Sequence, residues 1–304
     1  MKKKILILGG TGFIGQNLVN KFTKNKKYHL TITSRNPVHK KNKNNKLNFI
    51  KCDLTKISEY KKFDNENFDY IINLSGNIDH KNKKITKKIH NTAAKNIFKY
   101  FQKKKIKLFI QVGSSLEYGK ISSPQVENLK CKPLSYYGKS KLSSTKFIEK
   151  LAKKNKINYL IFRLYQVYGP FQKLDRLVPF TIDNCIKDKT FDCSTGEQYR
   201  DFLFINDLTN LFKIIFDKPK IRSGIYNVGS GIPVKVKTVI KLINKITNKG
   251  KPNFGGIKMR SDEIKKLYPN IKKIKKTFKW KPKVTLLNGL KKTVKFYEKK
   301  KSSS

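Results

Sequence analysis

Residues 3–19 have the sequence KKILILGGTGFIGQNLV, in which a short apolar run leads into three glycines at three-residue spacing, Gly9, Gly12 and Gly15. The apolar run predicts a buried strand and the residues after the glycines predict a helix. Glycine allows the tight turn, the close packing of helix on strand and the approach of a ligand to the backbone. The helix N-terminus attracts negative charge. The stretch therefore predicts a dinucleotide-binding turn in a strand–turn–helix unit.

Further apolar runs alternate with amphipathic stretches along the first half of the chain. The predicted strands are KKILILG, HLTITS, LNFIKCD, YIINLSG, KLFIQVGSS and NYLIFRLYQVYG, and the predicted helices cover 13–26, 83–104 and 136–155. Buried strands alternating with helices predict an α/β fold with a doubly wound, Rossmann-type parallel sheet. Beyond about residue 165 the elements become shorter and richer in Gly and Pro.

The change in pattern predicts two domains. We expect a dinucleotide-binding Rossmann domain at 1–165 and a smaller, interleaved α/β substrate domain at 166–304. Parts near 200–230 are expected to return to the first domain.

The formal net charge is +50 and the isoelectric point about 10.1. Lysine is spread along the whole chain, whereas arginine, the better reader of bases and phosphates, is scarce. We therefore expect no nucleic-acid partner, and an electrostatic field that favours anionic small molecules. The four cysteines form no CxxC pair and do not cluster with histidine, so we expect no metal site.

No apolar run approaches the ~20 residues that span a bilayer. The opening MKKKILILGG resembles a signal peptide, but its apolar stretch is shorter than the ~7–15 residues of a signal core. The sequence therefore predicts a cytoplasmic protein without a membrane partner.

The second predicted strand ends in Thr33-Ser34-Arg35-Asn36, without the carboxylate that holds the adenosine ribose in many NAD-binding sites. Arg35 is instead suited to a 2′-phosphate, unless it is one more surface cation. The cofactor is therefore predicted to be NADP or NAD, with NADP slightly favoured.

Tyr137 and Lys141 in SYYGKSK are four residues apart, which places both on one face of a helix. A lysine ammonium beside a phenol makes the phenol a usable acid or base near neutral pH. The same spacing recurs elsewhere, at Tyr100/Lys104, Tyr268/Lys272 and Tyr297/Lys301. Spacing alone does not distinguish these pairs.

Ordered motifs along nearly the whole chain give a more specific indication. In order they are GGTGFIG, Cys52-Asp53-Leu54, INLSG, GSSLEYG, YYGKSK, RLYQVYGP, RDFLFINDL, YNVGSG and FKWKPK. With these motifs the chain resembles the extended short-chain dehydrogenases/reductases, in particular the NAD-dependent epimerase/dehydratase family that acts on nucleotide-sugars.

The resemblance implies a catalytic set of Ser114, Tyr137 and Lys141, because the family places a Ser or Thr at the end of the fifth strand and the Tyr and Lys on the next helix. Ser115 competes with Ser114 for its role and otherwise contacts substrate. The implied cofactor-binding residues, which also include Tyr137 and Lys141, are Gly9, Gly12, Phe13, Ile14, Gly15, Arg35, Asp53, Leu54, Leu74, Ser75 and Gly76. The implied substrate-binding residues are Asn91, Gln166, Arg200 and Arg260, besides Ser115.

The implied activity is hydride transfer between a nicotinamide and the sugar C4, by an epimerase or a 4-ketoreductase. Dehydratases of this family carry an Asp-Glu pair directly after the catalytic Ser or Thr. Here Ser115 and Leu116 follow Ser114, and Glu117 comes one position late, so we expect no dehydratase activity. A nucleotide-sugar dehydratase and a non-catalytic NADP-binding regulator remain the alternatives. The resemblance also implies a homodimer, formed by the helices at 83–104 and 136–155.

Overall fold

The computed structural model describes the chain except residues 1, 37–46, 78–81, 260–262 and 303–304. The chain forms two compact units. The first contains residues 1–121, 127–164 and 217–226, and the second contains residues 122–126, 165–216 and 227–304.

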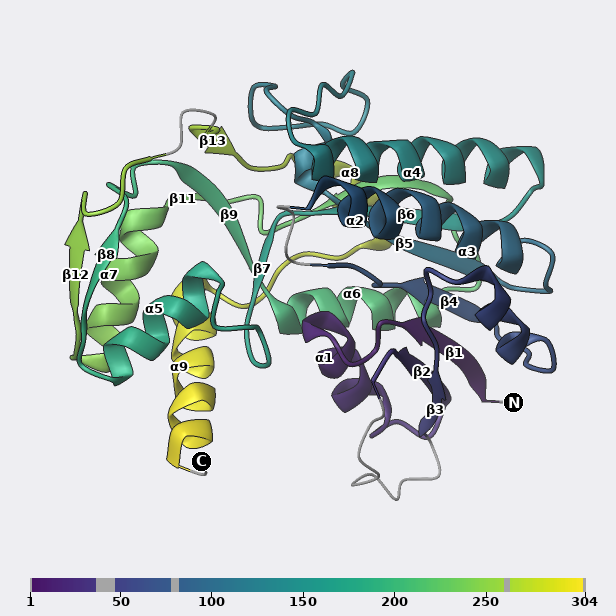
Figure 1. Cartoon of the computed structure of the whole chain (residues 1–304), viewed down its shortest axis with the longest axis horizontal. Coiled ribbons are helices and arrows are strands. Elements are labelled where there is room, and N and C mark those ends of the chain that lie inside the picture. The colour runs from purple at the N-terminus through teal and green to yellow at the C-terminus, as the bar shows by residue number, and fades with distance from the viewer. Residues whose placement is uncertain (1, 37–46, 78–81, 260–262, 303–304) are drawn as a thin grey trace. The chain divides into compact units, whose positions relative to one another are not determined.

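A seven-stranded sheet in the order β10-β6-β5-β4-β1-β2-β3 forms the centre of the first unit (Figure 1). Its strands are β1 (Lys3–Leu8), β2 (Tyr28–Ser34), β3 (Leu47–Lys51), β4 (Tyr70–Asn73), β5 (Leu108–Ser114), β6 (Tyr159–Leu164) and β10 (Gly224–Val228). The pairs from β3 through β6 are parallel, so their carboxyl ends meet at one edge. The reversal of strand order at β1 and β4 confirms the predicted doubly wound fold.

Helices cover both faces of this sheet. They are α1 (Phe13–Phe22), 3₁₀ helices η1 (Ile57–Phe63) and η3 (Ser115–Glu117), α2 (Lys83–Lys87), π-helix η2 (Lys88–Ala93), α3 (Ala94–Phe101) and α4 (Tyr136–Lys154). In Figure 1, α1 lies on the opposite side of the strands from α2, α3 and α4.

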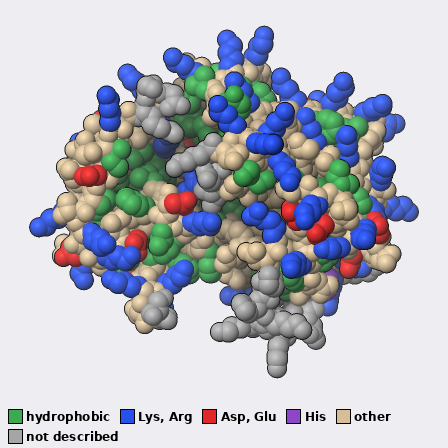
Figure 2. Space-filling view, viewed as in Figure 1, with side chains coloured by type: hydrophobic (Ala, Val, Ile, Leu, Met, Phe, Trp, Pro, Cys, Tyr) green, Lys and Arg blue, Asp and Glu red, His purple; other side chains and the backbone are tan. Residues whose placement is uncertain are grey.

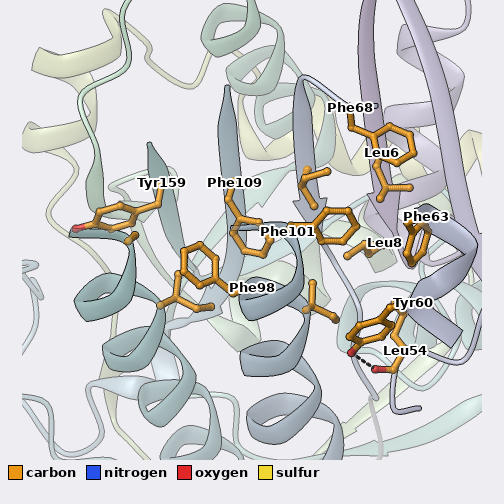
Figure 3. Packing of buried hydrophobic residues seen from close by; sticks show 14 of the residues in the cluster. Leu6, Leu8, Leu54, Tyr60, Phe63, Phe68, Phe98, Phe101, Phe109 and Tyr159 are labelled. Atoms are coloured by element: carbon orange, nitrogen blue, oxygen red, sulfur yellow. Dashed lines mark hydrogen bonds between the residues drawn. The ribbon is translucent and has the colours of Figure 1, made fainter. Parts of the chain in front are cut away.

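A hydrophobic core lies between one face of the sheet and the helices η1, α3 and α4 (Figure 3). Strand residues such as Leu6 and Phe109 meet Phe98 and Phe101 of α3, and the Phe98 and Phe109 rings lie edge to face at 5.0 Å. The Tyr60 hydroxyl satisfies its hydrogen bond inside this core by donating to the Leu54 carbonyl at 2.9 Å. Burial of these aromatic side chains stabilises the sheet that carries the candidate site.

Two local predictions need correction. The helix expected at 83–104 is one helical stretch whose middle turn is the π-helix η2, and this extra residue per turn shifts the face of every side chain after it. The apolar run NYLIFRLYQVYG, expected to form one strand, divides at Tyr165 into β6 and β7 (Gln166–Tyr168). Strand β6 pairs with β5, whereas β7 pairs with β9. A run of apolar residues does not show where a strand changes its partner.

The second unit is built from short strands and helices. The strands are β7, β8 (Thr190–Cys193), β9 (Tyr199–Phe204), β11 (Pro233–Lys235), β12 (Lys251–Phe254) and β13 (Lys266–Leu267). The helices are α5 (Leu177–Ile186), α6 (Ile205–Asp217, whose last residue belongs to the first unit), α7 (Val236–Thr247), α8 (Lys272–Phe278) and α9 (Leu286–Ser302). Strand β9 pairs with β7, β11 and β13.

The segment 122–126 belongs to the second unit although its sequence neighbours belong to the first. Gln125 is fully buried and anchors it. Its backbone N–H donates to the Tyr268 carbonyl at 3.0 Å, and its carbonyl accepts from the Asn270 N–H at 2.8 Å. Its side-chain oxygen accepts from the Tyr165 hydroxyl at 2.8 Å. These bonds tie the segment to residues that follow much later in the chain.

Lys and Arg side chains are scattered over the face shown in Figure 2 and do not gather into one patch. Among the described residues, no helix has the length and the apolar character that crossing a bilayer requires.

Candidate active site

The glycine turn joins β1 to α1 at the carboxyl edge of the sheet. Gly9 has a φ of +80°, which favours glycine, and its N–H donates to the Thr33 hydroxyl at 3.1 Å. A Cβ on Gly10 would lie 2.5 Å from Ile32 Cβ, and a Cβ on Gly15 would lie 2.5 Å from the Gly10 carbonyl oxygen. Gly10 and Gly15 therefore allow helix and strand to pack closely.

Gly12 differs from these glycines, because the protein itself leaves room for a side chain there. A Cβ on Gly12 would meet only the Gly9 carbonyl oxygen, at 3.4 Å, an ordinary contact. Gly12 is also the N-cap of α1, and no side chain caps this helix end. An uncapped helix N-terminus with a bare backbone in front of it fits a pyrophosphate, so the turn suits a dinucleotide.

We expect Gly12→Ala to weaken dinucleotide binding by at least about tenfold while the melting temperature stays close to that of the parent. The added methyl group would occupy the space of the pyrophosphate but would not strain the fold. Fluorescence titration with NAD(P)H and a thermal melt measure the two effects. Gly15→Ala is the comparison, since its Cβ would overlap backbone and lower the melting temperature. Unchanged affinity in Gly12→Ala would contradict the assignment of this turn.

The residues predicted for the adenosine end lie beside the turn after β3. Asp53 accepts the Thr55 N–H at 3.0 Å and the Thr55 hydroxyl at 2.8 Å. Partial burial raises the pKa of Asp53, but the hydrogen bonds from Thr55 and the charges of Lys56 and Arg35 outweigh it and hold that pKa below its ordinary value. Arg35 is exposed at the end of β2. The charge that it places beside Asp53 is available to an anionic group.

A chain of hydrogen bonds crosses the carboxyl ends of β4 and β5. The Ser75 hydroxyl donates to Asn73 Oδ1 at 2.5 Å, and Asn73 Nδ2 donates to Gln111 Oε1 at 2.9 Å. Gln111 Nε2 then donates to the Val112 carbonyl at 3.1 Å. These hydrogen bonds hold the backbone of Leu74 and Ser75 beside the glycine turn. The two segments are so close that a Cβ on Gly9 would contact the Ser75 backbone.

Helix α4 carries Tyr137 and Lys141. The Ser135 side chain caps its start by accepting the Gly138 N–H at 3.1 Å. A Cβ on Gly138 would lie 2.4 Å from the Leu116 carbonyl oxygen, so Gly138 lets the helix approach η3 closely. Lys141 Nζ donates to the Val112 carbonyl at 2.8 Å and lies 5.9 Å from the centre of the Tyr137 ring. The predicted pair therefore lies against the end of β5, the strand that ends at Ser114.

The Lys141 ammonium is buried, with about 5% of the residue exposed. Burial lowers the pKa of Lys141 to about 8, and the negative charge of Glu117 opposes this shift. Below pH 8 the side chain is mostly charged, and above it mostly neutral.

For the catalytic role that the sequence motifs imply for Lys141, activity is expected to fall as the pH rises through about 8, because a neutral Lys141 would no longer stabilise a phenolate on Tyr137. The measurement is kcat/KM as a function of pH from neutrality to about 10, the region in which an unperturbed lysine titrates. A profile that stays flat to about pH 10 would contradict this role for Lys141.

Ser114 ends β5, and Glu117 holds the turn that follows. The Ser114 hydroxyl accepts the Leu116 N–H at 3.2 Å, while Glu117 Oε1 accepts the Ser114 N–H at 2.9 Å. Glu117 Oε2 accepts from Arg163 Nε at 3.0 Å, and the Arg163 guanidinium lies 4.4 Å from the Tyr118 ring centre. Glu117 is fully buried, and both its oxygens are engaged. Its two oxygens therefore hold the turn and neutralise the Arg163 charge. Ser115 is also buried, as the first residue of η3.

His90, which no sequence motif indicated, lies beside Tyr137. Its ring meets the Tyr137 ring edge to face with centroids 4.8 Å apart, and its Nε2 lies 3.1 Å from the Asn77 carbonyl oxygen. The neighbouring Asn91, predicted to contact substrate, has a buried Oδ1 that accepts no hydrogen bond from the described part of the chain. The π-helix that carries both residues changes which side chain faces Tyr137, and such turns are frequent at functional sites.

The remaining predicted substrate residues belong to the second unit or lie outside the described residues. Gln166 is exposed at the start of β7. Arg200 on β9 is largely buried, pairs with Glu263 and donates to the Ile264 carbonyl at 2.7 Å. Arg260 lies outside the described residues. Within the described ranges, no group of three or more His, Cys, Asp or Glu side chains is arranged to hold a metal ion.

The parallel sheet and the glycine turn define a Rossmann-type nucleotide-binding protein. A family model described as NAD dependent epimerase/dehydratase family matches residues 5–229. The chain belongs to the NAD-dependent epimerase/dehydratase family, whose members are enzymes that act on nucleotide-sugars, as its sequence motifs predict.

Known proteins resemble the chain over nearly its whole length. CDP-abequose synthase of Salmonella typhimurium is 27% identical over 97% of this chain and 98% of its own. UDP-glucuronic acid 4-epimerase of Bacillus cereus, solved as a mutant with UDP-4-deoxy-4-fluoro-glucuronic acid and NAD, has a TM-score of 0.87 and 25% identity over 97% of this chain and 99% of its own. UDP-glucose 4-epimerase of Thermotoga maritima, solved with UDP-glucose, has a TM-score of 0.89 at 23% identity, over 98% of this chain and 99% of its own, and supports the fold.

Proposed function

We propose that this protein moves a hydride between a bound nicotinamide dinucleotide and C4 of a nucleotide-sugar, as a 4-epimerase or a 4-ketoreductase. The observation that carries the proposal is the position of Tyr137 and buried Lys141 against the end of β5, in a unit whose glycine turn fits a pyrophosphate. The UDP-glucuronic acid 4-epimerase among its structural relatives supports the substrate class.

Each residue has a separate role in the proposed reaction. The turn from Gly9 to Gly15, with Phe13 and Ile14 at the start of α1, holds the pyrophosphate, and Asp53 with Leu54 holds the adenine end. The nicotinamide, when bound, accepts or supplies the hydride at C4. Tyr137 takes the proton of the C4 hydroxyl or returns it. Lys141 favours its phenolate form through the positive charge, and the Ser114 hydroxyl orients the reacting oxygen.

The identity of the bound dinucleotide distinguishes the two reactions. An epimerase returns the hydride to the same sugar and so keeps its cofactor, whereas a ketoreductase must exchange it in every turnover. We would extract the purified protein with acid and with alkali in parallel and identify the released dinucleotide by mass. NAD(H) at nearly one per chain supports an epimerase, and loosely held NADP(H) supports a ketoreductase. No affinity for either would contradict the proposed function.

Arg35 is proposed to favour NADP over NAD through its charge on the 2′-phosphate. We expect Arg35→Asp to reduce NADPH affinity by about tenfold or more and to leave NADH affinity similar or improved. The measurement is the ratio of the two dissociation constants, with the exposed Lys26→Asp as a control for the same change of charge. An unchanged ratio would show that Arg35 is one more surface cation.

We also propose that the protein is a homodimer in which the helical stretch 83–101 and α4 face their copies. Both elements carry exposed apolar side chains, among them Ile85 and Tyr136. Sedimentation as a monomer at micromolar concentration would contradict this.

A further inference from the structure

A cavity of about 600 Å³ lies in the second unit, beside α6 and α8, and nothing in the proposed reaction uses it. Five of the nine residues that line it are lysines, namely Lys213, Lys275, Lys279, Lys281 and Lys283. They come from α6, from α8 and from the turn that follows α8. The lining therefore comes from three segments of the chain.

Lysine makes up five of the nine lining residues, and all five of these lysines are exposed. The one acidic residue at the cavity is Asp207, and its carboxylate is already occupied. Asp207 is 1% exposed, and its two oxygens accept the N–H groups of Lys283 and Val284 at 3.1 and 3.0 Å.

Four of the five lining lysines have no counter-charge in the part of the chain that the structure describes. Lys275, Lys279, Lys281 and Lys283 form no ion pair with a carboxylate among the described residues. Ammonium groups that face a common space repel one another, and an anion placed between them relieves the repulsion.

The backbone beneath these lysines is fixed. The Trp280 indole N–H donates to the Asp207 carbonyl at 3.1 Å, and Trp280 itself is buried. With the two bonds to the Asp207 carboxylate, the turn after α8 is attached at three points to the start of α6. The backbone that carries Lys279, Lys281 and Lys283 is therefore held in place, which lowers the entropic cost of ordering this turn around a ligand.

We propose that this cavity binds a small polyanion of the class of inorganic polyphosphates and the polyphosphate chains of nucleotides. Its volume lies within the range of small-molecule sites, and lysine binds phosphate groups as a flexible point charge. A concave site of this volume favours a compact ligand over the extended backbone of a nucleic acid. The scattered cations of Figure 2 likewise form no continuous track for such a backbone on the face shown.

Trp280 provides a direct probe, because it is the only tryptophan in the chain. Titration with tripolyphosphate is expected to change its fluorescence saturably, and equilibrium dialysis should show one extra site per chain. The triple variant Lys279→Gln, Lys281→Gln, Lys283→Gln should lose affinity by more than about tenfold. The matched control Lys241→Gln, Lys245→Gln, Lys249→Gln removes three exposed charges on and after α7, outside the lining, and should lose less than about threefold.

Three results would overturn the proposal. Equal losses in the two triple variants would mean that the anion responds to the overall charge of the chain. A loss of tripolyphosphate affinity in Gly12→Ala, as large as the loss in the lining variant, would place the anion in the glycine turn of the proposed reaction. Tighter binding of duplex DNA than of tripolyphosphate, with the same dependence on the lining lysines, would make this face a nucleic-acid surface. Because the experiment measures binding of tripolyphosphate, its result does not depend on whether the proposed enzymatic activity is correct.

Discussion

Replacement of Tyr137 by Phe is expected to lower kcat by about 10²–10⁴-fold, the usual contribution of a positioned acid or base. Only the hydroxyl is lost, so the ring contact with His90 and the hydrogen bond from Lys141 to the Val112 carbonyl persist. Dinucleotide affinity should therefore change little. Steady-state kinetics with a nucleotide-sugar, beside a cofactor titration, separate the two quantities.

Tyr100→Phe is the matched control for this variant. Tyr100 belongs to another tyrosine–lysine pair with the same spacing, but its hydroxyl donates to Asp64 at 2.6 Å. Its removal should cost about 1 kcal/mol of stability and leave kcat unchanged. If Tyr137→Phe kept full turnover, the proposed chemistry would be wrong. Full cofactor binding without any turnover in the parent protein would instead favour a non-catalytic NADP-binding regulator.

The variant Glu117→Gln is expected to destabilise the first unit by about 3–5 kcal/mol, because it leaves the Arg163 charge buried without its counter-charge. Such a loss is a large fraction of the stability of a typical domain. The glutamine oxygen can still accept the Ser114 N–H, so the change isolates the effect of charge. Urea denaturation monitored by circular dichroism measures the difference in the free energy of unfolding.

The double variant Glu117→Gln, Arg163→Met should recover most of that stability, since replacing both members of a buried pair removes the unpaired charge. It also loses the negative charge that opposes the fall in the pKa of Lys141. The alkaline limb of its activity profile should therefore move to lower pH. A double variant as unstable as the single one would contradict the ion-pair explanation, and an unmoved alkaline limb would contradict the coupling to Lys141.

The parts of the site predicted from the sequence are those encoded in short stretches. The glycine turn, the tyrosine–lysine pair and the serine at a strand end depend on residues close together in the chain, and the fold and family implied by these motifs are confirmed. The residue roles themselves remain predictions. Gly10 and Gly12 show the limit of prediction from sequence. A Cβ on Gly10 would collide with Ile32, whereas a Cβ on Gly12 would meet only a backbone oxygen. The sequence has glycine at both positions, so it does not reveal that one allows close packing and the other leaves room for a ligand.

Features that depend on distant residues could not be predicted. Glu117 and Arg163 are 46 positions apart, and only the pairing of β5 with β6 brings them together. His90 faces Tyr137 because a π-turn displaces the helical register, which a 3.6-residue period does not capture. The division of the last apolar run into β6 and β7 likewise depends on strands formed by later residues.

The placement of β10 and of residues 122–126 has a consequence for the protein during its synthesis. Strand β6 is buried along its whole length, and its outer neighbour, β10, is encoded about 60 residues later. When only the first 165 residues have emerged from the ribosome, β6 is therefore an open, apolar edge of the sheet. Such an edge can pair with other chains. The backbone hydrogen bonds of Gln125 form still later, because their partners are Tyr268 and Asn270. The nascent chain thus reaches a closed state only after Asn270 has been synthesised, and no single cut in the sequence yields either unit intact.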